Sequence, residues 1–276
     1  MTKTEYKIMF SDLDETLLTG QHVPDFNREA VKAAEEHGCR FVIATGRVYY
    51  MVDEILKELG AYHQPDHYAV CMNGGWIVNC ENDGLLYFRG LERALAQRVF
   101  DMVSALGNCI MIFTDRKCHM YHKDDYEYDR KVEQACALAL HDTDEFELTG
   151  DEQVGKFLVV ERDLEKMHAI GDKVKDTFGD VLDITYSSDR YVEIVAKGVS
   201  KGQGITWLCD HLNIPVDDAI AIGDNYNDVD MIQAAGLGCC VASSHDEIKA
   251  RADYVCTKDY DEGAVREVID TFVLHC

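Results

Sequence analysis

The sequence predicts an α/β protein with a Rossmann-like core, a doubly wound parallel sheet, and an α+β domain inserted into that core. Strands and helices alternate near the start of the chain and again after about residue 190, and the strands there are unbroken apolar runs, as in buried parallel sheets. Between these parts the predicted strands lie closer together, as in a mixed or antiparallel sheet. We therefore expect a core formed by residues 1–83 and 189–276, and an inserted cap domain formed by residues 84–188.

The first part of the core contains three apolar runs, and small or polar residues follow each of them. One predicted strand ends at residue 10, and two more cover 40–44 and 68–72. Predicted helices cover 27–36, which Asn27 caps, and 48–59. Because open α/β sheets bind ligands at the carboxyl ends of their strands, we expect the residues after these strands to form the functional site.

The rest of the chain divides between the inserted domain and the returning core, with hinges expected at 81–84 and 187–190. The inserted domain is expected to contain helices at 91–106, 126–140 and 164–177, and strands at 109–114, 118–122, 156–161 and 181–185. The returning core is expected to contain strands at 191–195, 219–222, 238–241 and 253–255, and helices at 201–212, 228–235 and 263–272.

The composition narrows the possible partners and compartments. With 51 acidic and 27 basic residues, the formal net charge is −24, so we expect no nucleic-acid or membrane partner. The 11 cysteines form no CxxC pair, which argues against a zinc or redox site of that spacing. Lys3, Glu5 and Lys7 interrupt any signal peptide, and no apolar run approaches the ~20 residues of a membrane helix. A reducing, cytoplasmic location fits best.

Two carboxylates stand directly after the first predicted strand, in the segment Ser11-Asp12-Leu13-Asp14. Side chains two residues apart in an extended segment point to the same side, so Asp12 and Asp14 can face one substrate together. One carboxylate could attack the substrate or hold a metal ion, while the other moves a proton. The alternative is that Asp14 and Thr16 only build a polar turn or cap a helix.

Four separated polar segments, each beside an apolar strand or at a helix start, supply carboxylates, a hydroxyl and a cation. Phosphoryl transfer needs this set, because fixed cations and hydrogen-bond donors must neutralise the transferring group. Mg²⁺ prefers oxygen ligands, including carboxylates. The segments are Asp12-Leu13-Asp14-Glu15-Thr16, Thr45-Gly46-Arg47, Lys201-Gly202 and Gly223-Asp224-Asn225-Tyr226-Asn227-Asp228.

In this order and spacing, the segments resemble the motifs of the haloacid dehalogenase (HAD) superfamily. Nearly the whole chain is similar to the Cof-type phosphatases, which carry a large, C2-type cap between the second and third motifs; Asn73-Gly74-Gly75 also resembles that family. The resemblance implies a Mg²⁺-dependent phosphatase that hydrolyses small phosphorylated metabolites, such as sugar phosphates or cofactor-like phosphomonoesters, through an aspartyl-phosphate.

The resemblance also implies catalytic roles for the first two carboxylates and a magnesium site. Asp12 would be the nucleophile, and Asp14 would be first the general acid for the leaving alcohol and then the base that activates water. Asp224 would bind Mg²⁺ together with Asp12 and the backbone carbonyl of Asp14. Asp228 would either bind the metal through water or orient Lys201.

The remaining motif residues would hold the phosphoryl group or the substrate. Thr45 would donate to phosphoryl oxygens with help from the Gly46 backbone, and Lys201 would pair with the nucleophile and the phosphoryl charge. Asn227 would reach the phosphate, and Asn73 would contact the substrate. The sequence departs from the family at Glu15, where many relatives have glycine, and we expect its side chain to point away from Asp12 and Asp14.

Other protein classes share part of this chemistry. A phosphomutase would return the phosphoryl group to a second hydroxyl of its substrate, so little free phosphate would be released. A non-catalytic phospho-acceptor module of the response-regulator kind is shorter and places its acceptor after a middle strand. A membrane pump with aspartyl-phosphate chemistry needs membrane spans, and a catalytically silent scaffold has no need for the motif residues.

The inserted domain is expected to exclude water and to select the small-molecule substrate. Six basic or aromatic residues are candidates for this role: Arg89, Arg116, His119, His122, Lys156 and Tyr186. Of these, Lys156, beside the apolar run Phe157-Leu158-Val159-Val160, is the first to test. We expect a monomer or a homodimer.

Overall fold

The computed structural model describes residues 5–275. It contains two compact units. Unit 1 comprises the described residues up to Arg47, Val52–Tyr87, and the described residues from Ser200 on. Unit 2 comprises Val48–Met51 and Phe88–Val199. The unit boundaries at 87/88 and 199/200 differ from the expected domain boundaries at 83/84 and 188/189. The functional division into core and cap stays a prediction.

Unit 1 is built on an eight-stranded sheet in the order β14-β13-β12-β1-β2-β3-β4-β5. The pairs from β14 to β3 are parallel, while β4 runs antiparallel to β3. The strands are β1 (Ile8–Ser11), β2 (Arg40–Ala44), β3 (Tyr68–Cys71), β4 (Trp76–Asn79), β5 (Gly84–Phe88), β12 (Ala219–Gly223), β13 (Leu237–Cys240) and β14 (Tyr254–Val255). Because β1 lies between β12 and β2, the ends of strands far apart in sequence are neighbours.

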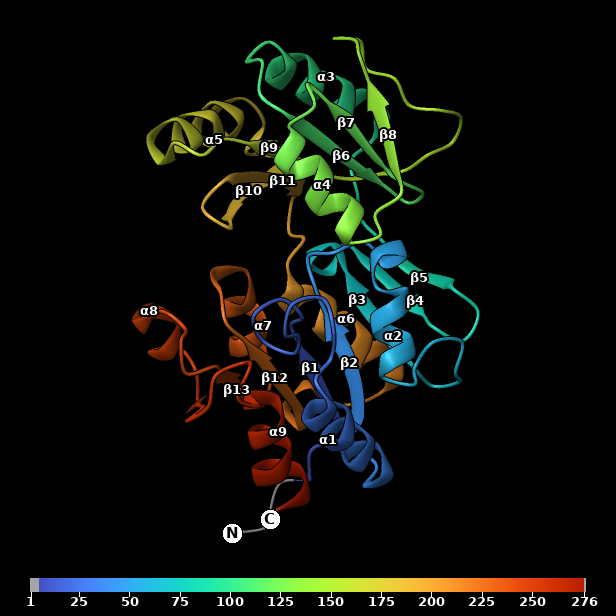
Figure 1. The fold of residues 1–276 in the computed structure, drawn as a ribbon, viewed down its shortest axis with the longest axis vertical. Coiled ribbons are helices and arrows are strands. Elements are labelled where there is room, and N and C mark those ends of the chain that lie inside the picture. Colours follow the sequence, from blue (N-terminus) through green and yellow to red (C-terminus); the bar gives the residue numbers. More distant parts are fainter. Residues whose placement is uncertain (1–4, 276) are drawn as a thin grey trace. The chain divides into compact units, whose positions relative to one another are not determined.

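Helices pack against both faces of this sheet, as the doubly wound fold requires (Figure 1). Ile8 and Phe10 of β1 pack with Ile205 and Leu208 of α6, so the intervening Met9 points to the opposite face. Helix α1 contacts β2 and α9, and helix α7 contacts α6 and β12. The helices are α1 (Asp25–Glu36), α2 (Asp53–Glu58), α6 (Lys201–Leu212), α7 (Val229–Ala234), α8 (Asp246–Lys249) and α9 (Ala264–Val268).

Unit 2 is built on a six-stranded sheet in the order β10-β11-β9-β6-β7-β8, antiparallel except for the parallel pair β7 and β8. One face forms an apolar core with α3 and α5, in which Phe157 packs with Phe100 and Val174. The strands are β6 (Ile110–Thr114), β7 (Cys118–Tyr121), β8 (Leu138–His141), β9 (Val154–Val160), β10 (Leu182–Ser187) and β11 (Tyr191–Ala196). The helices are α3 (Arg93–Ser104), α4 (Asp125–Glu133) and α5 (Leu164–Phe178).

Several expected elements differ from the observed ones. The strand expected at 191–195 in the returning core is β11 of unit 2, paired with β9 and β10. All six residues of β11 are buried, so its sequence resembles that of a buried parallel strand. The expected helix at 126–140 is wrong in its second half, because α4 ends at Glu133, Ala135 adopts φ 53°, and β8 follows.

The expected helices near the start of the chain are also corrected. Helix α1 begins after Pro24, and Asn27 lies inside it, where its amide donates 2.9 Å to the backbone oxygen of Leu17 instead of capping the helix. The expected helix at 48–59 is a short 3₁₀ turn, Tyr49–Met51, followed by α2. Strands β4 and β5 were not expected. None of the helices within residues 5–275 combines the length and apolarity that crossing a bilayer requires.

Candidate active site

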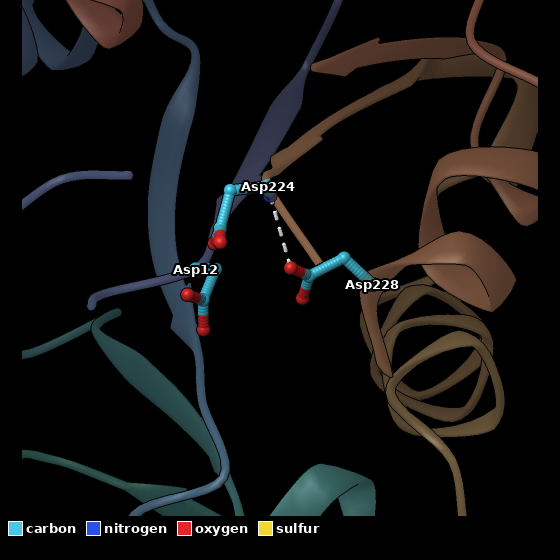
Figure 2. Close-up of side chains that lie close together, drawn as sticks. All are labelled: Asp12, Asp224 and Asp228. Atoms are coloured by element: carbon cyan, nitrogen blue, oxygen red, sulfur yellow. Dashed lines mark hydrogen bonds between the residues drawn. The ribbon is translucent and has the colours of Figure 1, made fainter. Parts of the chain in front are cut away.

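Three aspartates from the two ends of the chain meet where β1 and β12 end. Asp12 directly follows β1, and its backbone nitrogen donates 3.0 Å to the oxygen of Ile222 in β12. Carboxylate oxygens of Asp12, Asp224 and Asp228 all lie within 4.8 Å of one another (Figure 2). Parallel pairing of the two strands therefore brings together residues more than two hundred positions apart.

Lys201 is the cation at the centre of this cluster. It is the first residue of α6, which Ser200 caps, and its side chain is fully buried. The Lys201 Nζ lies 2.5 Å from Asp12 Oδ1 and 2.5 Å from Asp228 Oδ1. Burial alone would lower the pKa of Lys201, but the two carboxylates outweigh it and raise that pKa above its ordinary value. The ammonium is therefore charged.

The site raises the pKa of both Asp12 and Asp224, so it disfavours their ionised forms. Burial raises the pKa of Asp12 to about 7, and the carboxylate of Asp228 adds to the increase, which Lys201 opposes. Burial also raises the pKa of Asp224 well above its ordinary value, and again Asp228 adds to the increase. Three carboxylates facing one lysine leave an excess of negative charge, which an additional cation would stabilise.

Asp228 holds the loop after β12 as well as Lys201. Its Oδ2 accepts from the backbone N–H of Asp224 at 3.1 Å and of Asn225 at 3.0 Å. Both oxygens of Asp228 are thus engaged with protein donors. Gly223 is needed beside it, because a Cβ there would lie 2.4 Å from the Cβ of Asp228.

Asp14 is held by an arginine from the second strand-end segment. Arg47 Nε donates 3.0 Å to Asp14 Oδ2, and Arg47 Nη2 donates 2.6 Å to Asp14 Oδ1. The same Nη2 donates 2.9 Å to Gln21 Oε1. The Arg47 side chain is 6% exposed and that of Asp14 is 43% exposed, so a fixed arginine orients a solvent-accessible carboxylate.

Thr45 and Asn73 lie beside each other after β2 and β3. The backbone N–H of Asn73 donates 3.0 Å to the oxygen of Thr45, and Thr45 Oγ1 accepts 3.1 Å from the backbone N–H of Arg47. Asn227 Nδ2 lies 3.4 Å from Asn73 Oδ1, which links the β3 end to the loop after β12. Gly46 permits this packing, since a Cβ there would approach Asn73 Oδ1 to 3.1 Å.

Sequence reasoning gave Thr16 and Arg47 at most a turn or capping role and did not single out Gln21. Thr16 Oγ1 donates 3.0 Å to Asp224 Oδ1, although the two residues are 208 positions apart. Arg47 holds Asp14, and Gln21 Oε1 accepts from the Nη2 of Arg47. Thr16 and Arg47 lie inside the recognised motifs, and this position could have indicated that they contact the site. Nothing in the sequence indicates a role for Gln21.

Glu15, the departure from the family pattern, is exposed and adopts φ 58°. This left-handed conformation favours glycine, the residue that many relatives carry there. The backbone in this segment therefore retains the shape that a glycine would allow.

The donor set of the aspartate cluster fits Mg²⁺. The group offers carboxylate oxygens and no nitrogen or sulfur ligand, which matches a hard cation. Asp12 and Asp224 are the carboxylates available to it, because Asp228 is occupied by Lys201 and two backbone donors.

Unit 2 places the six candidate substrate-selecting residues in different surroundings. Lys156 is buried and pairs at 2.8 Å with Glu193, while His119 is buried and lies 2.6 Å from Glu152. Arg116 is half-exposed and lies 2.6 Å from Asp151. His122 lies 2.6 Å from Asp144. The ring of Tyr186 lies against Gly171 and His168, and Arg89 lies near Gly198. Their roles toward a substrate stay predictions.

Comparison with known proteins gives the family. The model of the haloacid dehalogenase-like hydrolases matches residues 9–269. Several relatives carry names that begin "Putative phosphatase". One, from Haemophilus influenzae, is 28% identical over 246 residues and covers 88% of each chain. Another, YxeH from Bacillus subtilis, is 26% identical over 270 residues and covers 98% of this chain and 99% of its own.

Solved structures agree with this fold over nearly the whole chain. A haloacid dehalogenase-like hydrolase from Bacteroides thetaiotaomicron superposes with a TM-score of 0.85 at 25% identity and covers 97% of this chain and 99% of its own. The HAD subclass IIB sugar phosphatase BT4131 superposes with a TM-score of 0.81 at 20% identity and covers 96% and 98%, which shows a shared fold.

The fold and the site thus define a hydrolase. The chain belongs to the haloacid dehalogenase-like hydrolases, in their Cof-type group, and it is an enzyme of the phosphatase class. The predicted family, fold class and enzyme class are confirmed.

Proposed function

We propose that this enzyme is a Mg²⁺-dependent phosphatase that hydrolyses small phosphorylated metabolites through an aspartyl-phosphate on Asp12. The observation that carries the proposal is the buried Lys201, held between Asp12 and Asp228 at 2.5 Å from each, with Asp224 in the same cluster. A fixed cation and crowded carboxylates suit the charge that develops during phosphoryl transfer.

In the first step, a carboxylate oxygen of Asp12 attacks the phosphorus atom, and the bond from phosphorus to the ester oxygen breaks. Lys201 stabilises the phosphoryl oxygens and holds Asp12 in position. Protonated Asp14 donates its proton to the departing oxygen, which leaves as an alcohol. Arg47 fixes the orientation of Asp14 through two hydrogen bonds.

In the second step, the ionised Asp14 takes a proton from a water molecule as that water attacks phosphorus. The bond between phosphorus and Asp12 breaks, inorganic phosphate leaves, and the proton remains on Asp14 for the next cycle. The hydroxyl of Thr45 accepts from the Arg47 backbone, so its own hydrogen can donate to a phosphoryl oxygen. Asn227 is the further amide donor on this side.

Asp12, Asp224 and the backbone carbonyl of Asp14 would hold Mg²⁺. When bound, the ion supplies charge neutralisation, which lets the carboxylate nucleophile approach an anionic phosphate. The raised pKa of Asp12 and of Asp224, both caused first by burial, supports a requirement for an additional cation.

Sugar phosphates are the substrate class that we propose to test first. BT4131, which shares this fold, is named a sugar phosphatase. Candidate substrates are small phosphomonoesters, and the panel should include cofactor-like phosphates as well as sugar phosphates. Product analysis should measure free phosphate, because a phosphomutase would instead return an isomeric phosphate ester.

The test is release of phosphate from p-nitrophenyl phosphate and from the panel, with Mg²⁺ and with EDTA. We expect turnover that requires Mg²⁺ and that Asp12→Asn abolishes. Glu15→Gln is the matched control, since it removes a neighbouring exposed carboxylate and should leave turnover nearly unchanged. Full activity of Asp12→Asn would refute the assignment of the nucleophile.

A further inference from the structure

Strand β5 leaves one edge of the unit 1 sheet open. It comes last in the strand order, next to β4, and no other strand within residues 5–275 pairs with its outer side (Figure 1). A strand edge carries backbone N–H and C=O groups that can pair with another strand, and proteins usually protect it by a short strand, a charged side chain or a proline. None of these protects β5, which has 5 residues and reads Gly84-Leu85-Leu86-Tyr87-Phe88.

The other edges of the two sheets are protected or unsuited to pairing with themselves. Strand β14 has 2 residues, and β10 carries Asp183. Strand β8 is apolar, but the exposed acids Asp142, Asp144 and Glu145 follow it, and no basic residue lies at 134–137 before it. Two copies of β8 in antiparallel pairing would therefore have no cation to set against these acids.

The side chains of β5 form a partly exposed apolar patch. Leu85 is 51% exposed, and Leu86 and Tyr87 are only partly buried. The ring centroid of Tyr87 lies 5.2 Å from that of Trp207 on α6. An exposed leucine beside partly buried aromatic rings is apolar surface that a second strand could cover. Because the formal net charge is −24, two copies repel each other over most of their surface, but β5 itself is uncharged.

The charges that flank β5 match those of a second copy in the opposite direction. Asp83 precedes the strand, Arg89 follows it, and both residues are exposed. In an antiparallel pair centred on Leu86, Leu85 lies opposite Tyr87 of the second copy, and Asp83 lies opposite its Arg89. The two-fold axis repeats each contact. Asp83 Oδ2 also lies 3.1 Å from His63 Nε2, a surface contact that leaves the Asp83 side chain 48% exposed.

We propose that β5 is a dimer interface, at which the β5 strands of two copies pair antiparallel about Leu86 and join two eight-stranded sheets. The partner is a second copy of this chain, because the acid before β5 and the base after it complement the same segment when it is reversed. One pair of short strands is small beside the roughly 1,200–2,000 Å² of a standard interface, so the dimer dissociates as the protein is diluted.

The proposal is independent of the phosphatase proposal, since no residue of the aspartate cluster takes part in the contact. Its test is sedimentation velocity of the full-length protein from micromolar to submillimolar concentrations at physiological ionic strength. We expect the mean mass to rise from that of one chain toward that of two. Leu85→Lys should weaken dimerisation by about tenfold or more, because a charge on the edge opposes strand pairing. Leu140→Lys is the matched control, since Leu140 is also 51% exposed and lies on the edge strand β8.

Charge reversal tests the direction and register of the pairing. Asp83→Lys and Arg89→Asp each place like charges opposite each other at both ends of the paired strands. Each should raise the dissociation constant by about three- to thirtyfold, because the dimer contains the contact twice. The double variant restores opposite charges and should recover the wild-type value within about threefold. Glu145→Lys is the control for net charge, because it changes an exposed carboxylate in the same way away from β5.

Three results would overturn the proposal. They are a monomer at every concentration, a dimer that Leu85→Lys leaves intact, and a double charge variant as weak as the single ones. The wild-type measurement decides whether the dimer exists even where a variant folds poorly.

Discussion

Arg47→Met removes the contact that orients the proposed general acid. Arg47 makes two charge-assisted hydrogen bonds to Asp14, at 3.0 and 2.6 Å, from a side chain that is 6% exposed. A hydrogen bond to a charged group contributes about 1.5–3 kcal/mol. Because the Asp14 side chain is 43% exposed, water replaces part of the interaction when Arg47 is removed. We therefore assign about 1.5–3 kcal/mol to the two hydrogen bonds together, not to each.

This magnitude corresponds to a decrease in kcat of about ten- to a hundredfold. We expect KM to change little, because Asp14 acts on the leaving oxygen and not on the bound phosphate. The decrease in kcat should be larger for an alkyl phosphate than for p-nitrophenyl phosphate, whose leaving group needs little protonation. Steady-state kinetics on both substrates measures this difference, and Arg40→Met, on a half-exposed arginine 3.9 Å from Asp66, is the control.

A double-mutant cycle with Asp14→Asn isolates the pair. If Arg47 acts through Asp14, Arg47→Met should have almost no further effect in the Asp14→Asn background. Equal losses in both backgrounds would refute the reasoning and would point to direct contact between Arg47 and the substrate.

Three further predictions concern stability. Lys201→Met leaves two buried aspartates without their cation, so it should lower the free energy of unfolding by about 3–5 kcal/mol in denaturant titrations. Added Mg²⁺ should raise the stability of this variant by more than it raises that of the wild type. His119 and two threonines outweigh burial and lower the pKa of Glu152 to about 2. The stability that ionised Glu152 gives the folded protein should therefore be complete above about pH 5. The difference in Tm between the wild type and Glu152→Gln should shrink as the pH falls toward 2. Gly74→Ala should lower Tm, because φ is 91° and a Cβ would lie 2.2 Å from the Ser200 oxygen.

Each of these predictions has a contradicting outcome. Wild-type stability of Lys201→Met in the absence of Mg²⁺ would show that Lys201 is not the buried counter-ion. A difference in Tm for Glu152→Gln that grows on acidification would have the wrong sign. An unchanged Tm for Gly74→Ala, with Gly107→Ala as a control at positive φ without nearby atoms, would exclude the steric account.

The sequence predicted most of what depends on local pattern. The strand endings before Asp12, Thr45 and Asp224 are apolar runs followed by polar residues, and parallel pairing then brings those endings to one edge of the sheet. The order of the motifs indicated the family, which the comparisons confirm. The roles of the individual residues are predictions that the experiments above test.

What the sequence did not predict depends on tertiary geometry. Arg47 reaches Asp14 across 33 positions, and no periodicity encodes the direction of a loop side chain. Strand β11 was assigned to the wrong sheet, because a strand buried on both faces has the same apolar pattern in either unit. The end of α4 depends on Ala135 in the left-handed region, which alanine rarely adopts, so composition gave no stop signal there.

The central claim is that Asp12 carries the phosphoryl group during turnover. The direct measurement uses Asp14→Asn, which should release p-nitrophenol but hydrolyse the intermediate slowly, because the base for the second step is missing. Rapid acid quench with Mg²⁺ and p-nitrophenyl phosphate should show a burst equal to the enzyme concentration, and borohydride reduction of the acyl phosphate should convert Asp12 to homoserine. No burst, or a reduced residue at any other position, would contradict the account.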